Sequence, residues 1–393
     1  MNRDGLRVTV VTRIYLPEPA AASFRLGALV RRLTLRGADV LVLTTLTHRL
    51  RAAERSAPGR VKRWPVLRDS SGYVRGYLQY LSFDLPVFFR LLLSARVDVV
   101  VVEPPPTTGF AVRIVCALRR IPYVYYAADV WSDASASTGS PAVVVRLLRA
   151  VESWVMAGAA RVLAVNELLA ARVRELAPAA RVKEVGNGVD TEIFTSNGPS
   201  AQGRPYAIYA GTTSEWQGAD IFLRALRQVR EHKPDARLVF LGQGSAWDSL
   251  KTLAIELDIE DSVDFIDSVP ANVAAEWLRG ARLAMVSMKP DQGYDYALPT
   301  KVLASLASGT PVLYAGTGQA EQLISSAPGE VDAGMVVPYS VDEVAERLMN
   351  CFEVPAPSIE TRTALAEWAA STVSLDAVAD RVAEVLEEVS HRA

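Results

Sequence analysis

Apolar residues in the first half of the chain fall into short β-branched runs separated by longer amphipathic stretches. The first such stretch, Ala22–Arg36, has the periodicity of a helix and ends at Gly37. Buried strands are predicted at Leu6–Thr12, Asp39–Thr45, Val97–Val102, Pro122–Ala127, Arg161–Val165 and Arg181–Val185. Strands that alternate with helices in this way are typical of a parallel, doubly wound α/β sheet.

The same pattern starts again after residues 195–204, a polar segment rich in Gly and Pro that is typical of a linker. Further strands are predicted at Tyr206–Ala210, Arg237–Leu241, Val263–Ile266, Arg282–Val286 and Pro311–Tyr314. The last segment, Ile359 to Ala393, has helical periodicity and few helix breakers. We therefore predict two consecutive Rossmann-like domains, because 393 residues exceed what a single core usually holds.

Composition limits the classes of protein to which this chain can belong. Half of the residues are apolar and 22% are charged, as in globular proteins with large buried sheets. The two cysteines lie far apart and the three histidines lack the spacing of metal ligands, so neither a disulfide framework nor a metal is predicted. No apolar run approaches the roughly 18 residues of a membrane span, and no signal peptide precedes the first strand. A cytoplasmic protein without a transmembrane segment is expected.

The net charge of −2 hides an asymmetry. Residues 1–195 carry 27 basic and 16 acidic side chains, a net of +11, whereas residues 196–393 carry 15 and 28, a net of −13. A cluster from Arg49 to Arg75 contributes much of the basic excess. Such a surface suits an anionic substrate, an anionic membrane or the acidic half of the same chain, and no nucleic-acid partner is predicted.

An aromatic-rich segment, Val74–Ser94, overlaps the end of this arginine cluster. One interpretation is an interfacial element that faces an acceptor or a membrane. The other is an ordinary core helix that breaks at Pro86.

A helix N-terminus that suits an anion is predicted near residue 300. Pro299 fits the first position of a helix because its missing N–H would be unpaired there anyway, and Gly309 with Pro311 fits the end. Free backbone N–H groups beside Lys301 then form a chemically suitable phosphate site. Many Rossmann-type helices nevertheless start with Pro and end with Gly, so the motif alone does not establish a ligand.

A dinucleotide cofactor is disfavoured. Gly316 and Gly318 imitate the start of a dinucleotide fingerprint, but Glu321 stands where the third glycine belongs. No Gly-rich fingerprint follows the first strand either.

Several motifs occur in a characteristic order along nearly the whole chain. They are Leu16-Pro17-Glu18-Pro19 through Arg25, Asp129-Val130-Trp131, Gly186-Asn187-Gly188-Val189-Asp190, Tyr209 through Gly218, Phe240 through Gly244, and Pro299-Thr300-Lys301 through Pro311. Together they resemble the retaining GT-B glycosyltransferases that use nucleotide sugars, the large group 1 family. The resemblance implies an α/β fold of two Rossmann-like domains that face each other across a cleft. Residues 1–195 would bind the acceptor and residues 196–374 the nucleotide sugar, and a helix at about 375–393 would cross back to the N-terminal domain.

The resemblance also implies roles for individual residues. Donor contacts are implied for Ala21, Ala22, Arg25, Gly211, Thr212, Gln217, Gly242, Gly244, Tyr296, Leu298, Pro299, Thr300 and Lys301. Lys301 and Asp129 are expected to act in catalysis, Lys301 on the leaving diphosphate and Asp129 on the sugar or the acceptor. Asp129, Trp131 and Asn187 are expected at the acceptor site or the hinge, although Asp129 could instead cap a helix and Asn187 could be only a turn residue.

Two departures from the family pattern concern the donor. Many relatives carry paired glutamates where this chain has Tyr296 and Ala304, and the second usually binds the ribose hydroxyls. The Arg and Lys of the loop Gly211–Gly218 are replaced by Thr212 and Gln217. These losses suggest a donor such as a deoxythymidine diphosphate sugar, which lacks the 2′-hydroxyl, or a degenerate and inactive donor site.

The resemblance implies transfer of a sugar from a nucleotide-diphosphate donor with retention of anomeric configuration, without a metal or an organic cofactor. A nucleotide-sugar epimerase and a non-catalytic nucleotide-sugar-binding subunit are the alternatives. The acceptor is expected to be either a lipid-linked saccharide, bound by a protein peripheral at the inner face of a membrane, or a small natural product or thiol.

Overall fold

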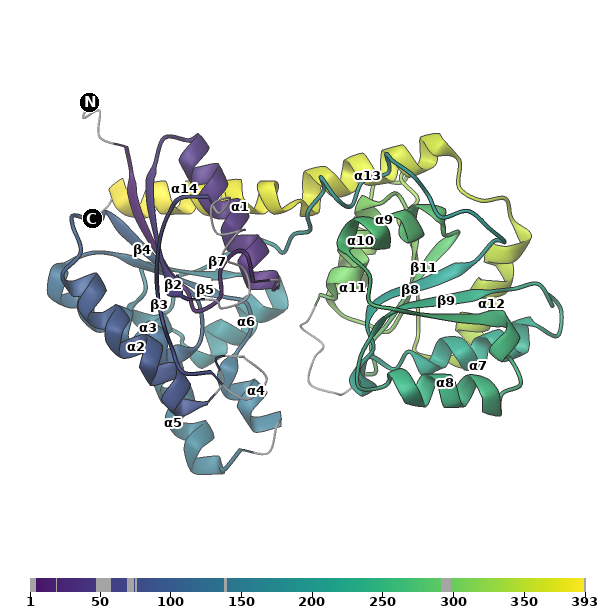
Figure 1. The fold of residues 1–393 in the computed structure, drawn as a ribbon, viewed down its shortest axis with the longest axis horizontal. Helices are drawn as coiled ribbons and strands as arrows, with labels where there is room; N and C mark the ends of the chain where they lie inside the picture. Colours follow the sequence, from purple (N-terminus) through teal and green to yellow (C-terminus); the bar gives the residue numbers. More distant parts are fainter. Residues whose placement is uncertain are drawn as a thin grey trace. The chain divides into compact units, whose positions relative to one another are not determined.

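The computed structural model describes residues 5–18, 20–46, 58–68, 74, 76–137, 140–290 and 298–391 (Figure 1). The chain forms two compact units. Unit 1 comprises residues 1–187 and 375–393, and unit 2 comprises residues 188–374. The polar segment 195–204 belongs to unit 2, because Arg279 donates hydrogen bonds to the carbonyls of Thr195 and Pro199. The chain therefore passes between the units a few residues before the predicted linker.

Unit 1 is built on one parallel sheet of seven strands. In sheet order the strands are β3 (Arg60–Trp64), β2 (Asp39–Thr45), β1 (Arg7–Val11), β4 (Val99–Val102), β5 (Tyr123–Ala127), β6 (Arg161–Ala164) and β7 (Val182–Glu184). The four valines of β4 are fully buried, as expected for a strand that helices cover on both faces. From the central pair β1 and β4, the chain adds β2 and β3 on one side of the sheet and β5 to β7 on the other. Doubly wound sheets bind ligands at this switch point between β1 and β4.

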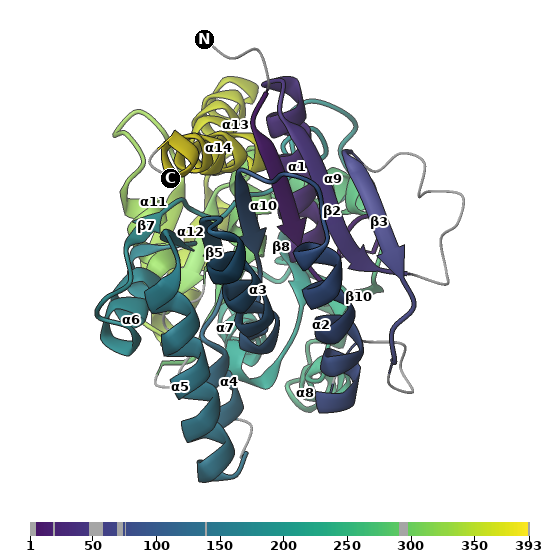
Figure 2. The same cartoon turned by 90° about the vertical axis from the view of Figure 1, so that its left-hand side faces the viewer.

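Helices cover both faces of this sheet. They are α1 (Ala21–Leu35), α2 (Tyr77–Leu92), α3 (Pro106–Arg119), α4 (Trp131–Ser137), α5 (Ala142–Gly158), α6 (Glu167–Leu176) and α14 (Leu375–His391). Helix α3 packs against both α2 and α5, and α1 packs along α14 (Figure 2). This arrangement places the row α2–α3–α5 next to solvent on one side of unit 1.

Two features of unit 1 differ from the predictions. Strand β3 was not predicted, because it lies in the arginine cluster and its basic residues interrupt the apolar pattern of this edge strand. Helix α2 runs through Pro86 without a break, so the expected break is wrong. Proline at this position removes the hydrogen bond to the carbonyl four residues earlier and its ring crowds that carbonyl, but the packing of Phe83, Val87 and Leu91 in the core holds the helix together. Most of the segment 49–75 lies outside the described residues.

Unit 2 repeats the architecture with six parallel strands. Their order is β10 (Val263–Asp267), β9 (Leu238–Gln243), β8 (Ala207–Thr212), β11 (Leu283–Ser287), β12 (Val312–Ala315) and β13 (Gly334–Val337). The helices are α7 (Asp220–Val229), α8 (Trp247–Glu256), α9 (Ala271–Gly280), α10 (Thr300–Ala307), α11 (Gln319–Ser325), α12 (Val341–Glu353) and α13 (Ile359–Val373). Strand β13 was not predicted, because its four residues form too short a run to stand out. The predicted α/β fold of two Rossmann-like domains is confirmed.

The C-terminal helical segment divides at Ser374, whose backbone is extended. Helix α13 packs against α10 in unit 2, whereas α14 packs against α1 in unit 1. Beside this division, the backbone N–H of Val189 donates to the carbonyl of Val373 at 2.9 Å. The chain therefore leaves unit 1 and returns to it through two adjacent segments, and the predicted crossover helix is confirmed.

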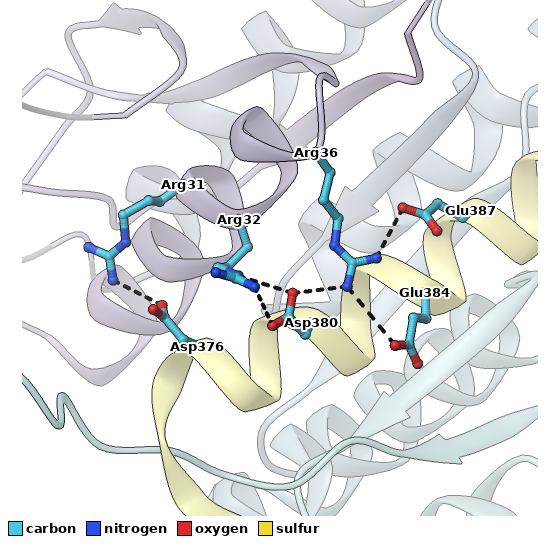
Figure 3. Close-up of polar contacts among 7 residues, drawn as sticks. All are labelled: Arg31, Arg32, Arg36, Asp376, Asp380, Glu384 and Glu387. Carbon is cyan, nitrogen blue, oxygen red and sulfur yellow. Dashed lines mark hydrogen bonds and ion pairs between the residues drawn. The ribbon is translucent and has the colours of Figure 1, made fainter. Parts of the chain in front are cut away.

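Ion pairs attach α14 to α1 (Figure 3). Asp380 accepts hydrogen bonds from Arg32 at 2.6 and 3.0 Å and from Arg36 at 2.9 Å. Arg31 pairs with Asp376 at 3.1 Å, and Arg36 also reaches Glu387 at 3.2 Å. Part of the acidic excess of the second half thus neutralises the basic first half of the same chain.

Candidate functional site

A pocket of about 540 Å³ opens in unit 2, at the carboxyl ends of β8 and β9 and the start of α10. Among the described residues that line it, Lys301 is the only one whose side chain can carry a charge near neutral pH. The others are apolar or neutral: Val189, Phe194, Ala210, Gly211, Thr212, Trp216, Gln217, Leu241, Gly242, Gln243, Ser268, Val269, Ala274, Leu278, Met288, Leu298, Pro299, Thr300 and Ala304. A pocket with one cation and no anion among these residues suits an anionic ligand.

The N-terminus of α10 forms one wall of this pocket. Pro299 is the N-cap, with φ −61° and ψ 122°, and no side chain caps the helix. The first helical residue is Thr300, one position later than predicted. Because no carbonyl precedes them in the helix, the N–H groups of Thr300 and Lys301 have no intrahelical partner and carry the positive end of the helix dipole.

Lys301 is buried, with 9% of its surface exposed. Its ammonium group lies 3.9 Å from the centre of the Tyr209 ring and donates to Tyr209 Oη at 2.5 Å, the carbonyl of Thr212 at 2.8 Å and Gln217 Oε1 at 3.2 Å. Within the described part of the chain, no carboxylate compensates its charge. Burial therefore lowers the pKa of Lys301 well below its ordinary value. Three neutral acceptors hold the ammonium group in place, and an anion would supply the missing charge.

Glycines form the floor of the pocket. Gly242 has φ 147°, and a Cβ there would lie 2.1 Å from the carbonyl oxygen of Gly211. Glycine is therefore required for β8 and β9 to end close together under the pocket. Gly244 contacts the backbone of Thr213 and does not line the pocket, so its role is in packing.

The other predicted donor residues of unit 2 gather at the same place. Leu298, Thr212 and Gln217 line the pocket, as does Ala304 at the position of the family glutamate. Tyr296 lies outside the described residues.

In unit 1, polar side chains meet at the carboxyl ends of β1, β4 and β5. Arg25 of α1 pairs with Glu103, which directly follows β4, at 2.5 Å, and its guanidinium lies 4.7 Å from the centre of the Tyr126 ring. Asp129, two residues beyond β5, is close enough for Arg25 to favour its charged form. Burial outweighs this attraction and raises the pKa of Asp129 to about 6. A carboxyl group with this pKa can accept or donate a proton near neutral pH.

The remaining predicted residues of unit 1 have clear positions. Ala21 and Ala22 begin α1, whose N-cap Ala20 provides no capping side chain. Arg25 is buried, and Glu103 already compensates its charge, so it does not offer a free cation to a donor. Asn187 is the last residue of the first segment of unit 1.

Trp131 begins α4, and its backbone N–H donates to Glu152 Oε1 at 2.9 Å. The neighbouring N–H of Ser132 donates to Glu152 Oε2 at 3.0 Å. Glu152, rather than Asp129, therefore caps this helix, and it fixes the loop that carries Asp129 and Trp131.

Sequence reasoning missed three residues of this cluster: Glu103, Glu152 and Arg13. Arg13 and Glu103 each follow a buried strand within two residues, and this position is the signal that could have identified them. No such signal exists for Glu152, because it lies inside a helix and only the tertiary fold brings it to α4.

The described residues contain no cluster of three or more potential metal ligands. Nor does any described helix combine the length and the hydropathy needed to cross a bilayer.

The chain has two α/β units, each built on a parallel sheet with polar residues at the carboxyl ends of its strands. Its last helix returns to the first unit. These features define a protein of the GT-B fold class. The family model "Glycosyl transferase 4-like domain" matches residues 20–188, which correspond to unit 1. The model "Glycosyl transferases group 1" matches residues 204–353 of unit 2. The chain therefore belongs to the group 1 glycosyltransferases of the GT-B fold.

Comparisons with individual proteins agree with this family. A D-inositol 3-phosphate glycosyltransferase of Thermomonospora curvata is 30% identical over 66% of this chain and 63% of its own. A GDP-mannose-dependent alpha-(1-6)-phosphatidylinositol monomannoside mannosyltransferase of Mycolicibacterium smegmatis is 26% identical over 53% of this chain and 57% of its own. This chain spans about half the length of the curated relatives it matches, for example 42% and 57%. Sucrose-phosphate synthase from Thermosynechococcus elongatus shares the fold, with a TM-score of 0.76 at 15% identity over 99% of this chain and 100% of that one.

Proposed function

We propose that this chain transfers a sugar from a nucleotide-diphosphate donor to an acceptor hydroxyl or thiol, with retention and without a metal. The observation that carries the proposal is the buried ammonium group of Lys301, the one charge among the described residues of the unit 2 pocket, beside the uncapped start of α10. A diphosphate matches both features, since it would compensate the charge and accept hydrogen bonds from the free N–H groups.

In the proposed reaction, the bond between the anomeric carbon and the diphosphate oxygen breaks. The acceptor oxygen or sulfur bonds to the same carbon on the face that the diphosphate leaves, and a diphosphate oxygen takes the acceptor proton. Lys301 and the helix dipole stabilise the charge that develops on the leaving group. Asp129 orients the acceptor or the sugar through its carboxyl oxygens.

A thermal-shift panel with UDP, GDP, dTDP and ADP, and with their common sugars, tests the donor site. One nucleotide family should raise the unfolding temperature, since a ligand at 100 times its dissociation constant adds about 2.7 kcal/mol. Lys301→Gln should reduce the shift by about half or more. Lys251→Gln is the matched control, because Lys251 also lies over an aromatic ring, that of Trp247 at 5.5 Å, but outside the pocket. No shift with any nucleotide in the wild type would contradict the proposal.

Product analysis tests the finer parts of the proposal. NMR of the product formed from a donor with a known anomer should show that anomer preserved, and activity should survive EDTA. An inverted product would contradict retention, and loss of activity that Mg²⁺ or Mn²⁺ restores would contradict metal independence.

We infer that the donor carries deoxythymidine. Ala304 stands where the family glutamate binds the ribose hydroxyls, and no described residue of the pocket offers a carboxylate in its place. A ribose lacking the 2′-hydroxyl loses less from this absence. Calorimetry should give tighter binding of dTDP than of UDP, and Ala304→Glu should shift the preference toward UDP. Equal or tighter binding of UDP by the wild type would count against this assignment.

A lipid-linked acceptor at the inner face of a membrane is the favoured acceptor. Leu78, Leu81, Leu85 and Phe89 line one side of α2, and each is more than half exposed. Phe110 on α3 and Trp154 on α5 are two further partly exposed aromatic residues, their rings 5.2 Å apart, and arginines on the same helices would meet anionic headgroups. One relative is named for a phosphatidylinositol mannoside and another for a small inositol phosphate, so a small acceptor in solution is the alternative.

Sedimentation with anionic vesicles at low salt distinguishes these acceptors. The wild type should sediment with the vesicles, and the double variant Leu81→Glu/Leu85→Glu should not. Ile255→Glu, which changes an equally exposed residue of α8 in unit 2, should sediment like the wild type. A wild type that stays in solution would favour the small acceptor.

A non-catalytic binding subunit is the second candidate, because Ala304 weakens donor recognition and neutral groups of the protein already engage Lys301. Slow hydrolysis of the donor without acceptor is expected of a transferase and not of a binding subunit. An epimerase is disfavoured, since no described residue of the pocket is a histidine or a carboxylate.

A further inference from the structure

We propose that unit 1 carries an effector site for a phosphate dianion at the amino ends of β1, β4 and β5. A cavity of about 770 Å³ opens there, lined by the residues that precede or begin these three strands and by the end of α14. Because the strands are parallel, this edge of the sheet is opposite to the one that carries Glu103 and Asp129. A ligand in this cavity would therefore contact neither the proposed donor site nor the proposed acceptor site.

Arginine supplies most of the charge in this cavity. Among the described residues that line it, four guanidinium groups face two carboxylates and one imidazole. The charged side chains are those of Arg7, Arg96, Arg119 and Arg120, with Asp98 and Glu387, and the imidazole is that of His391.

Both carboxylates of the cavity already have partners. Asp98 accepts the backbone N–H of Arg7 at 2.9 Å and lies 3.6 Å from Nε of Arg96. Glu387 pairs at 3.2 Å with Arg36, which does not line the cavity. Neither carboxylate is therefore left to compensate the remaining arginines.

Arg119 and Arg120 form no ion pair within the described part of the chain. Arg119 donates to the carbonyls of Leu91 and Ala95 at 2.7 and 3.1 Å and to Ser94 Oγ at 2.6 Å. It thus caps the end of α2, a position that favours a cation even without a ligand. The guanidinium of Arg120, by contrast, has no hydrogen-bond partner among the described residues.

The backbone of Arg120 provides an independent observation. Arg120 ends α3 in the left-handed conformation, with φ 55° and ψ 44°, which is unfavourable for a residue with a Cβ atom. At the ends of α1 and α10, the chain has Gly37 and Gly309 at positive φ. No contact within the protein explains an arginine where glycine is the better residue. A strained residue in the wall of a cavity is typical of a functional site.

A phosphate dianion fits this arrangement. Neighbouring guanidinium groups can bind its oxygens through forked, charge-assisted hydrogen bonds, and its two charges match the two arginines that lack a carboxylate. The cavity has the size of a small-molecule site, so it can hold either inorganic phosphate or a phosphate ester. Ser390 and His391 of α14 line the same cavity, so a bound ligand would join the end of α14 to the sheet and stabilise unit 1.

Calorimetric titration with glycerol 3-phosphate and inorganic phosphate tests the assignment, with glycerol as the uncharged probe. The wild type should bind at least one of the two phosphates and not glycerol. The phosphate that binds more tightly identifies the ligand as an ester or as the free ion. Arg120→Gly should weaken this binding roughly tenfold or more, and Arg120→Lys should retain part of it. A wild type that binds neither phosphate would overturn the assignment.

Asp258→Gly is the matched control. Asp258 is the other described non-glycine residue with positive φ, at 56°, and it lies in unit 2 outside the cavity. Both glycine substitutions relieve the same kind of strain, so each should raise the unfolding temperature by about 2 °C. Asp258→Gly should leave phosphate binding unchanged. Equal binding by the wild type and Arg120→Gly would overturn the assignment and identify adventitious binding elsewhere on the protein.

Hydrogen exchange of the wild-type protein locates the bound phosphate without any substitution. Binding should slow the exchange of backbone amides at residues 119–121 and 387–391. Slower exchange only at the start of α10 would overturn the assignment, because it would place the phosphate at Lys301. Lys301→Gln should keep the binding of glycerol 3-phosphate, whereas Arg120→Gly should keep the nucleotide shift. Failure of the effector site is therefore distinguishable from failure of the proposed function.

Discussion

Lys301 was identified in the sequence from the proline before it and the glycine after its helix. The structure adds that the ammonium group points back under the loop after β8, where Tyr209, Thr212 and Gln217 hold it. Burial without a compensating carboxylate makes the charged form unfavourable until an anion arrives. The residue thus combines a fixed position with a charge that no described carboxylate compensates.

Nucleotide binding should therefore depend on pH through Lys301. In the protein without ligand, burial lowers the pKa of Lys301, and a bound diphosphate raises this pKa again. At a pH between the two pKa values, binding of the nucleotide is therefore accompanied by uptake of a proton. Affinity should fall as pH rises through this window. Lys301→Gln should lose about 1.5–3 kcal/mol of binding and most of the pH dependence. Calorimetry in two buffers of different ionisation enthalpy measures the proton uptake; none in the wild type would refute the prediction.

Asp129→Asn should stabilise the protein while impairing its function. The pKa of Asp129 is raised from 3.8 to about 6, so the folded state binds more protons than the unfolded state between these values. This carboxyl group therefore lowers stability as pH rises from 4 to 6, by at most about 3 kcal/mol. Urea unfolding should show a larger free energy of unfolding for the variant than for the wild type at pH 7, and this difference should disappear near pH 4. The variant should also lose glycosyl transfer activity. A loss of stability at pH 7 would contradict this account.

At the scale of elements, helix ends explain how the sites are built. The start of α10 is left uncapped, so its N–H groups remain available to a ligand. The start of α4 is satisfied internally, since both carboxylate oxygens of Glu152 accept its first N–H groups. One helix end is thereby ready for an anion, and the other serves to position Asp129 and Trp131.

Glu152→Ala should loosen the loop that α4 supports. The substitution leaves two N–H donors without their carboxylate in a site where Glu152 itself is 0% exposed, and a loss of about 2–4 kcal/mol is expected. Glu152→Gln should lose less, because its amide oxygen can still accept one N–H. Urea unfolding gives the stability. An alanine variant as stable as the wild type would contradict the capping role.

Helix α2 shows how packing can override a local rule. Pro86 interrupts its hydrogen bonds, yet Phe83, Val87 and Leu91 bury one side of the helix and keep it continuous. Its opposite side exposes the leucines assigned to the membrane. Of the two interpretations of this segment, the broken helix is wrong, while the interfacial role stays a prediction.

At the scale of the whole molecule, unit 1 is assembled from both ends of the chain. Helix α14 buries Val378, Val382, Leu386 and Val389 among the other residues of unit 1, and its acidic residues bind the arginines of α1 (Figure 3). Unit 1 is therefore complete only when the C-terminus has been made.

Removal of residues 375–393 should selectively destabilise unit 1. The truncated protein would expose the apolar surface that α14 covers, so we expect a separate, lower-temperature transition for unit 1 and aggregation, while unit 2 unfolds as before. Differential scanning calorimetry resolves the two transitions. The milder substitution Asp380→Asn, with a partly exposed ion pair, should cost about 1 kcal/mol and less at high salt. Unchanged unfolding of the truncated protein would refute the prediction.

Local signals in the sequence determined most of the strands and helices, the two-domain fold and the family, and they singled out Lys301 at the start of α10. Apolar periodicity and turn residues act over a few positions, so the pattern alone was sufficient there. The edge strand β3 was missed because charge obscured its pattern, and Glu152 and the Glu103 pairing of Arg25 were missed because their partners lie up to 78 residues away. Only the tertiary structure decided which cations are compensated and which are not. The charge state of a buried group depends on neighbours that folding, and not sequence proximity, brings into contact.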